Sequence, residues 1–142
     1  MTSAQIKDRA AGSTLVDTTT MTGAEFACGR EFLGLPPQWV AAKLGVHIKT
    51  IYQWEKSAKV PERAQQLMTL LLRMAEQSVA RMTVKWPAGQ PIPVPHGRDN
   101  SPGTEYPASF HRALASRVAE RTNARLIYIG EEESNAVPSQ AE

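Results

Sequence analysis

Hydrophobic positions recur every three to four residues in three short stretches of the first half of the chain, about 23–33, 37–44 and 48–56. This spacing predicts three short amphipathic helices. The sequence from Thr22 to Glu25 has the form of a capping box at the start of the first helix, because a threonine is followed three residues later by a glutamate.

A fourth helix, over about 61–82, gives the strongest periodic signal in the sequence. Its apolar sector is wide, because two neighbouring rows of side chains are both largely hydrophobic. A unit of three short helices is too small to cover this sector. We therefore expect the fourth helix to pack against either the C-terminal region or a second copy of the chain.

The C-terminal third mixes helix and strand signals. Seven of the ten prolines follow residue 86, so Ile92 and Val94 can form only a short edge strand. Hydrophobic residues at four-residue spacing predict a fifth helix over about 107–122. The β-branched and aromatic residues of 125–129 predict a strand.

The composition is that of an ordinary globular protein, with 42% hydrophobic and 21% charged residues, which argues against a wholly disordered chain. The formal net charge is only +2, but it is unevenly spread. Residues 22–86 hold nine basic and five acidic side chains, whereas every charged residue of 131–142 is a glutamate. The acidic tail masks a basic body, which points weakly to a polyanionic partner. The apolar runs, such as 70–72 and 126–129, are far too short to span a bilayer, so we expect a cytoplasmic protein.

Nothing in the sequence suggests catalysis or a bound cofactor. Cys28 and the three histidines lack the spacing of a zinc site, so no metal is expected. No serine or cysteine lies in a recognisable nucleophile motif, and there is no glycine-rich phosphate loop. We therefore expect no enzymatic activity.

The second and third predicted helices are short and are joined by Gly45-Val46-His47, which describes a helix-turn-helix. Ala41 is small enough for these two helices to cross closely, and Trp54 would help to lock their angle. Such packing leaves the N-terminal residues of the third helix pointing away from the core, where they can enter a major groove of DNA.

Over about 35 residues the chain follows a pattern that runs Phe26-x-x-x-Arg30-x-x-Leu33-Gly34-Leu35 and then Val40-Ala41-x-x-Leu44-Gly45-Val46-x-x-x-Thr50-Ile51-x-x-Trp54-Glu55. This pattern resembles the lambda-repressor-like, or XRE, family of helix-turn-helix DNA-binding proteins. The resemblance implies a mainly α fold, with a five-helix lambda-repressor-like domain, a long fourth helix and a small C-terminal α/β dimerisation extension.

The resemblance also implies roles for individual side chains. Arg30 and Glu55 would form a partly buried, structural salt bridge. The side chains that face base edges would be those of Ile48, Lys49 and Gln53. The candidate phosphate contacts are Gln38, Lys43, His47, Thr50, Tyr52 and Lys56.

The order of elements after residue 60 resembles a narrower group of small phage and bacterial autorepressors, among them the anti-CRISPR-associated regulators. This resemblance implies a homodimer that forms through the C-terminal parts of the chain and represses its own operon. The candidate dimer interface residues are Leu67, Leu71, Met74, Met82, Phe110 and Leu114.

We therefore expect a flexible leader at 1–21, a DNA-binding domain at 22–83, a dimerising C-terminal extension at 84–130 and a disordered acidic tail at 131–142. The expected function is that of a homodimeric, sequence-specific transcriptional regulator, nucleoid-associated, which binds a palindromic operator in double-stranded DNA and represses its own or an adjacent operon. Two alternatives stay open. One is an antitoxin or adaptor whose C-terminal region binds a protein partner, and the other is a regulator that also binds RNA.

Overall fold

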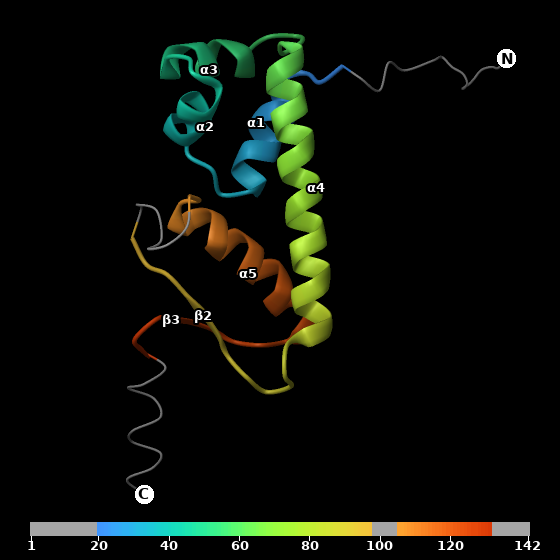
Figure 1. Ribbon diagram of the computed structural model, residues 1–142, viewed down its shortest axis with the longest axis vertical. Coiled ribbons are helices and arrows are strands. Elements are labelled where there is room, and N and C mark those ends of the chain that lie inside the picture. Colours follow the sequence, from blue (N-terminus) through green and yellow to red (C-terminus); the bar gives the residue numbers. More distant parts are fainter. Residues whose placement is uncertain (1–19, 98–104, 132–142) are drawn as a thin grey trace, which may run out of the picture.

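The computed structural model describes residues 20–97 and 105–131 (Figure 1). Most of the predicted leader, and all of the predicted acidic tail except Glu131, lie outside the described residues. Within these two ranges the fold is mainly helical, with one small parallel sheet. None of the helices described here is both long and apolar enough to cross a membrane.

The helices and strands lie where the hydrophobic pattern predicts them, with ends that differ by a few residues. The helices are α1 (Gly23–Phe32), α2 (Pro37–Leu44), α3 (Ile48–Glu55), α4 (Glu62–Lys85) and α5 (Ala108–Thr122), and the strands are β2 (Ile92–Val94) and β3 (Leu126–Tyr128).

Local chemistry explains where several helices begin and end. The capping box of α1 is present, because Thr22 Oγ1 accepts a hydrogen bond from the Glu25 N–H at 3.0 Å and Glu25 Oε1 accepts one from the Thr22 N–H at 2.9 Å. Gly45 ends α2 with a φ of 67°, and Asn123 ends α5 with a φ of 59°. Both residue types tolerate this left-handed conformation, which stops a helix.

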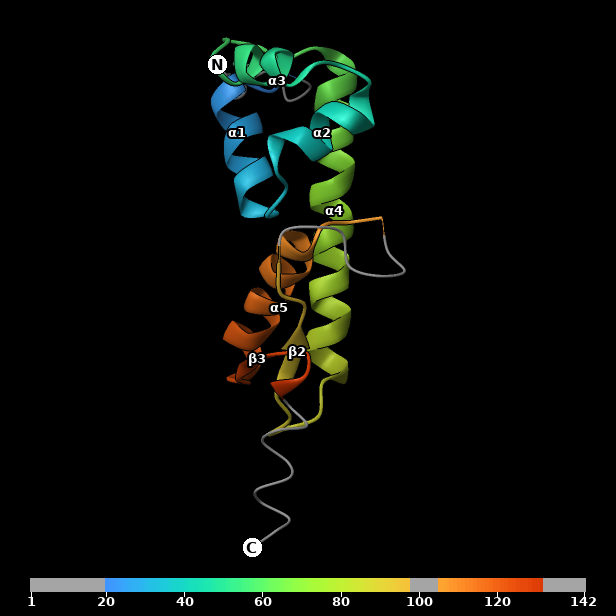
Figure 2. The ribbon, with the colours of Figure 1, turned by 90° about the vertical axis from the view of Figure 1, so that its left-hand side faces the viewer.

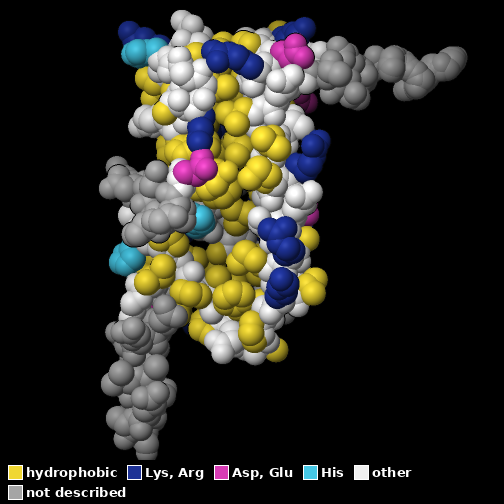
Figure 3. Space-filling view, in the orientation of Figure 1, with side chains coloured by type: hydrophobic (Ala, Val, Ile, Leu, Met, Phe, Trp, Pro, Cys, Tyr) yellow, Lys and Arg dark blue, Asp and Glu magenta, His cyan; other side chains and the backbone are white. Residues whose placement is uncertain are grey.

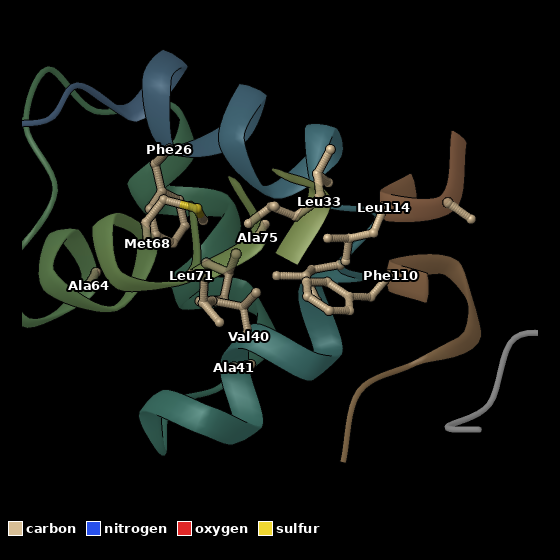
Figure 4. Packing of buried hydrophobic residues seen from close by; sticks show 14 of the residues in the cluster. Phe26, Leu33, Val40, Ala41, Ala64, Met68, Leu71, Ala75, Phe110 and Leu114 are labelled. Carbon is tan, nitrogen blue, oxygen red and sulfur yellow. The ribbon is translucent and has the colours of Figure 1, made fainter. Parts of the chain in front are cut away.

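The long helix α4 runs along both lobes of the molecule and connects them (Figures 1 and 2). In the N-terminal lobe, α1, α2 and α3 lie to one side of its first half, with α1 in contact with it; in the C-terminal lobe, α5 packs on its second half and the sheet packs on α5. A single core passes through both lobes. Figure 4 shows Phe26 beside Met68 in the N-terminal lobe, and Phe110 and Leu114 close to Ala75.

The sheet consists of β2 and β3 in parallel, with Ile92 opposite Leu126 and Val94 opposite Tyr128. Parallel neighbours need a crossover connection, and α5 is that connection. The C-terminal lobe is therefore a small β-α-β unit whose helix packs on α4. The two predicted strands are confirmed, and their parallel pairing is a finding of the structure.

The start of α5 joins the two lobes. Ser109 Oγ donates a hydrogen bond to the Gly34 carbonyl oxygen at 2.5 Å, at the turn between α1 and α2. Gly34 has a φ of +67°, and a Cβ atom there would lie 2.3 Å from the Ser109 carbonyl oxygen. The lobes can meet this closely only because residue 34 has no side chain.

A matched pair of substitutions tests this junction. Gly45 has the same φ of +67°, but a Cβ atom there would have open space around it. Gly45→Ala should therefore cost only the strain of the left-handed backbone, about 1 kcal/mol of unfolding free energy. Gly34→Ala adds a clash with the α5 backbone and should cost about 3 kcal/mol. Urea unfolding followed by circular dichroism measures both losses, and equal losses would contradict the close contact of the lobes.

Candidate nucleic-acid interface

One side of α3 is held firmly against the rest of the N-terminal lobe. Ile51 is fully buried in the core. Trp54 meets Phe26 of α1 edge to face, with ring centroids 6.3 Å apart. Beyond the end of α3, the Gly23 N–H donates a hydrogen bond to the Ser57 carbonyl oxygen at 3.0 Å. The position of α3 relative to α1 is therefore set by both packing and hydrogen bonds.

An ion pair between α1 and α3 strengthens this arrangement. The Arg30 guanidinium donates to both carboxylate oxygens of Glu55, with Nε to Oε2 at 2.6 Å and Nη2 to Oε1 at 3.3 Å. Its remaining terminal nitrogen, Nη1, donates to the Leu35 carbonyl oxygen at 3.0 Å. The two side chains are only 11% and 13% exposed. The structure thus contains the Arg30–Glu55 pair that the sequence pattern implies, in the two-pronged geometry that suits a guanidinium and a carboxylate.

The N-terminus of α3 is capped by a histidine. The Lys49 N–H donates to Nδ1 of His47 at 3.1 Å. A neutral imidazole whose Nδ1 accepts carries its proton on Nε2. The exposed His47 ring can therefore donate one further hydrogen bond outward from the start of the helix.

The opposite side of α3 faces outward. Lys49, Tyr52, Gln53 and Lys56 are exposed, whereas Ile48 and Thr50 are half-buried. Residues four apart lie on the same face of a helix, so Lys49 and Gln53 present their polar ends side by side. Figure 3 shows Lys, Arg and His side chains at the end of the molecule that carries α3.

The two candidate phosphate contacts on α2 differ in their surroundings. Gln38, near the start of α2, is exposed. Lys43 forms an ion pair with Glu105, and its Nζ lies 5.4 Å from the centroid of the Trp39 ring. The hydrogen bond that the Lys43 ammonium donates to the Glu105 carboxylate raises the pKa of Lys43 above its ordinary value. Because Glu105 already offsets its charge, Lys43 is a weaker candidate for a phosphate contact than its position in the sequence implies.

The predicted dimer interface residues do not form one exposed surface. Leu71, Phe110 and Leu114 are buried within a single chain, at 3%, 7% and 7% exposure, because α5 packs on α4. These three residues are therefore unavailable to a second copy in this conformation. Leu67 and Met82 are half-buried, and Met74 is 38% exposed. Packing against the C-terminal region of the same chain therefore accounts for most of the wide apolar sector of α4.

Contacts between α2 and the segment before α5 were not anticipated from the sequence. Trp39 Nε1 donates to the Glu105 carbonyl oxygen at 2.9 Å, and the Trp39 ring stacks on Tyr106 at 5.5 Å. From α4, Arg63 Nη1 donates to the Leu44 carbonyl oxygen at the end of α2, at 2.8 Å. No local signal marks such pairs, since the partners are separated by 66 residues in one case and 19 in the other.

The part of the chain that the structure describes contains no group of three or more His, Cys, Asp or Glu side chains that could hold a metal ion. Cys28 is exposed as a free thiol on α1.

Comparison of the chain with models of protein families, with curated proteins and with solved structures found no match. The geometry of α3 and its surroundings is therefore the basis for assigning a function.

The ion pair can be tested with a built-in control, because Arg30 has a second carboxylate neighbour. Glu31 lies 3.9 Å from Arg30 Nη2 and is 68% exposed. Glu55→Gln leaves the mostly buried guanidinium without its charged partner and should lower the unfolding free energy by about 2–3 kcal/mol. Glu31→Gln should change it by less than about 0.5 kcal/mol, because exposed pairs contribute little. Chemical unfolding of the two variants measures the difference; equal, small losses would show that the Arg30–Glu55 pair does not stabilise the lobe.

Proposed function

We propose that this protein is a sequence-specific regulator of transcription that binds double-stranded DNA as a homodimer. In this proposal α2 and α3 form a helix-turn-helix, and α3 enters the major groove. The regulator represses its own or an adjacent operon by occupying a palindromic operator.

The observation that carries the proposal is the two-sided character of α3. Its inner side is held by Ile51, Trp54 and the Arg30–Glu55 ion pair, while Lys49 and Gln53 are exposed on its outer side. A helix that is rigidly mounted and presents long polar side chains to solvent fits the width of a major groove.

The exposed side chains have the chemistry for reading bases. The Lys49 ammonium can donate to O6 and N7 of guanine, and the Gln53 amide can bond N6 and N7 of adenine with both of its ends. Ile48 can contact a thymine methyl group. Each of these contacts distinguishes one base pair from the others, which supplies sequence specificity.

A second group of side chains suits the DNA backbone. His47 can donate to a phosphate through Nε2, and Gln38 is exposed near the start of α2. Such contacts position the protein without reading sequence. The proposed phosphate contacts are Gln38, His47, Thr50, Tyr52 and Lys56, whereas Lys43 is left out because Glu105 holds it.

Self-association would use the surface that the fold leaves apolar. Three hydrophobic residues in and just after β3 are between 42% and 55% exposed, namely Leu126, Tyr128 and Ile129. An exposed strand with large hydrophobic side chains favours contact with another chain. We therefore place the dimer contact at β3 in the C-terminal lobe, away from α3.

Binding to DNA selected from a random double-stranded pool tests the function. Lys49→Ala and Gln53→Ala should each weaken binding to the selected sequence by about 1–3 kcal/mol, because each removes one base contact. Lys85→Ala, at the far end of α4, removes the same charge as Lys49→Ala and should bind like the wild type. Fluorescence anisotropy at fixed salt measures the affinities, with circular dichroism to show that the helices are intact.

Two results would contradict the proposal. One is a failure to enrich any sequence from the pool, together with no binding at low ionic strength, where phosphate contacts are strongest. The other is wild-type affinity for both Lys49→Ala and Gln53→Ala.

The dimer contact has its own test. Leu126→Glu places a charge on the exposed face of β3 and should raise the dimer dissociation constant at least about tenfold, because a carboxylate is costly to bury. Leu70→Glu, at an equally exposed position on the first half of α4, should leave dimerisation unchanged. Sedimentation velocity over a range of protein concentrations measures both. Dimerisation that survives Leu126→Glu but not Leu70→Glu would move the interface to α4.

A further inference from the structure

The C-terminal lobe contains a cavity that the proposed DNA contacts do not use. It has a volume of about 660 Å³ and lies between the second half of α4, strand β2 and helix α5. This volume is within the range of about 300–1,000 Å³ that is typical of sites for small organic molecules. Figure 3 shows hydrophobic side chains gathered over this half of the molecule.

The lining of the cavity has a consistent chemistry. Met74 and Met82 come from α4, Ile92 and Val94 from β2, and Phe110 and Leu114 from α5. The methionines adapt easily to the shape of a ligand, because the side chain is unbranched and polarisable. Tyr106 and Phe110 also line the cavity, and their rings stack on each other with centroids 4.5 Å apart, so the lining includes aromatic surface held in place by ring stacking.

Among the residues that the structure describes, no charged side chain lines this cavity. Its lining residues include no Lys, Arg, Asp or Glu, and the polar groups among them are Ser78, Tyr106 and His111. Burial lowers the pKa of His111 below its ordinary value, so the imidazole is uncharged at neutral pH. Arg81 donates to Ser78 Oγ at 3.4 Å from outside the lining. A charged ligand would lose its hydration here without a charged lining residue to replace it, which disfavours it.

We propose that this cavity is a binding site for a neutral, flat aromatic molecule of two to four rings. The two lining rings and the methionines would contact its apolar surface. Ser78 and His111 would offer hydrogen bonds to a single polar substituent.

The cavity wall also contacts the proposed DNA-binding unit. Tyr106 lines the cavity and stacks on Trp39 of α2, while the backbone of the preceding residue, Glu105, accepts a hydrogen bond from the same indole. A ligand that displaces Tyr106 would disturb the contact between α5 and α2. This consequence rests on the proposed function: the ligand would act as an effector that changes the affinity for DNA, whereas binding of the ligand itself does not depend on DNA.

Two commercial dyes that share one skeleton test the site. N-phenyl-1-naphthylamine is neutral and aromatic, and 8-anilinonaphthalene-1-sulfonate is the same skeleton with a sulfonate. Both fluoresce weakly in water and strongly in apolar surroundings. The neutral dye should bind the full-length protein at one molecule per chain, at least about tenfold more tightly than the sulfonate, because the sulfonate would be buried without a cation.

A graded series at Ser78 locates the binding. Ser78→Leu partly fills the cavity from α4 and Ser78→Phe fills it further, so affinity for the neutral dye should fall in that order, by about tenfold or more in the second variant. The matched control is Ala80→Phe, which adds the same ring on the exposed side of α4. Circular dichroism and sedimentation velocity monitor folding and assembly, and the Leu variant keeps the test valid if the Phe variant does not fold.

Three outcomes would overturn the binding site, and two others bear on its coupling to DNA. Equal affinity of the wild type and both Ser78 variants would place the dye elsewhere, and tighter binding of the sulfonate would contradict a neutral ligand. A second copy of the chain would fill the cavity if two results came together: the wild-type dimer binds no dye, and Ser78→Phe converts that dimer to monomers. If the dye binds as expected but the affinity for the selected DNA does not change, the site stands and its coupling to α2 fails. If the protein selects no DNA sequence at all, the proposed function fails. Dye binding then still tests whether the cavity binds a neutral aromatic molecule.

Discussion

Burial of the apolar side of α4 is the interaction on which the rest of the structure depends. Ala64 and Met68 belong to the core of the N-terminal lobe, and Leu71, Ala75 and Val79 continue the same core toward the C-terminal lobe. Neither lobe has enough chain to bury a substantial core by itself. Because one continuous helix of 24 residues serves both lobes, it fixes the distance between α3 and the sheet. Its length, about 36 Å at 1.5 Å per residue, therefore sets how far apart two copies of α3 would lie in a dimer that forms through β3.

In the N-terminal lobe, the residues that hold α3 in place and the residues that it exposes to solvent lie on opposite sides of the helix. Apolar packing by Ile51 and the charged pair of Arg30 and Glu55 both act on the inner side. The outer side, with Lys49 and Gln53, is exposed to solvent. The same separation applies to His47, whose Nδ1 accepts a hydrogen bond at the start of the helix and so leaves Nε2 for a further partner. Specific binding to DNA requires this kind of preorganised side-chain display.

Much of the fold could be predicted from the sequence, because its elements are determined by local chemistry. The capping box at Thr22 and the glycine at 45 mark helix ends directly, and the period of hydrophobic residues marks α4. The Arg30–Glu55 pair could be anticipated only through a family pattern, since its partners are 25 residues apart. The parallel pairing of β2 with β3 could not be predicted, because the choice of partner depends on how α5 packs between them.

The same reason explains why three of the predicted dimer residues, Leu71, Phe110 and Leu114, lie in the core of a single chain. A hydrophobic sector on a helix shows that something covers it, but its periodicity carries no information on whether that cover is α5 or another chain. Phe110 and Leu114 are buried because α5 packs against α4, so they do not form an exposed surface. The cavity likewise arises only from the way three elements meet.

The central claim is that α3 reads bases in the major groove at two sites related by the symmetry of a dimer. Methylation interference on the DNA that the protein selects tests it most directly, since dimethyl sulfate modifies guanine N7 in the major groove and adenine N3 in the minor groove. The account predicts interference at guanine N7 in two half-sites whose centres are about one helical turn, or 10–10.5 base pairs, apart or a multiple of this. Interference confined to adenine N3, or a single site without a symmetric partner, would contradict it.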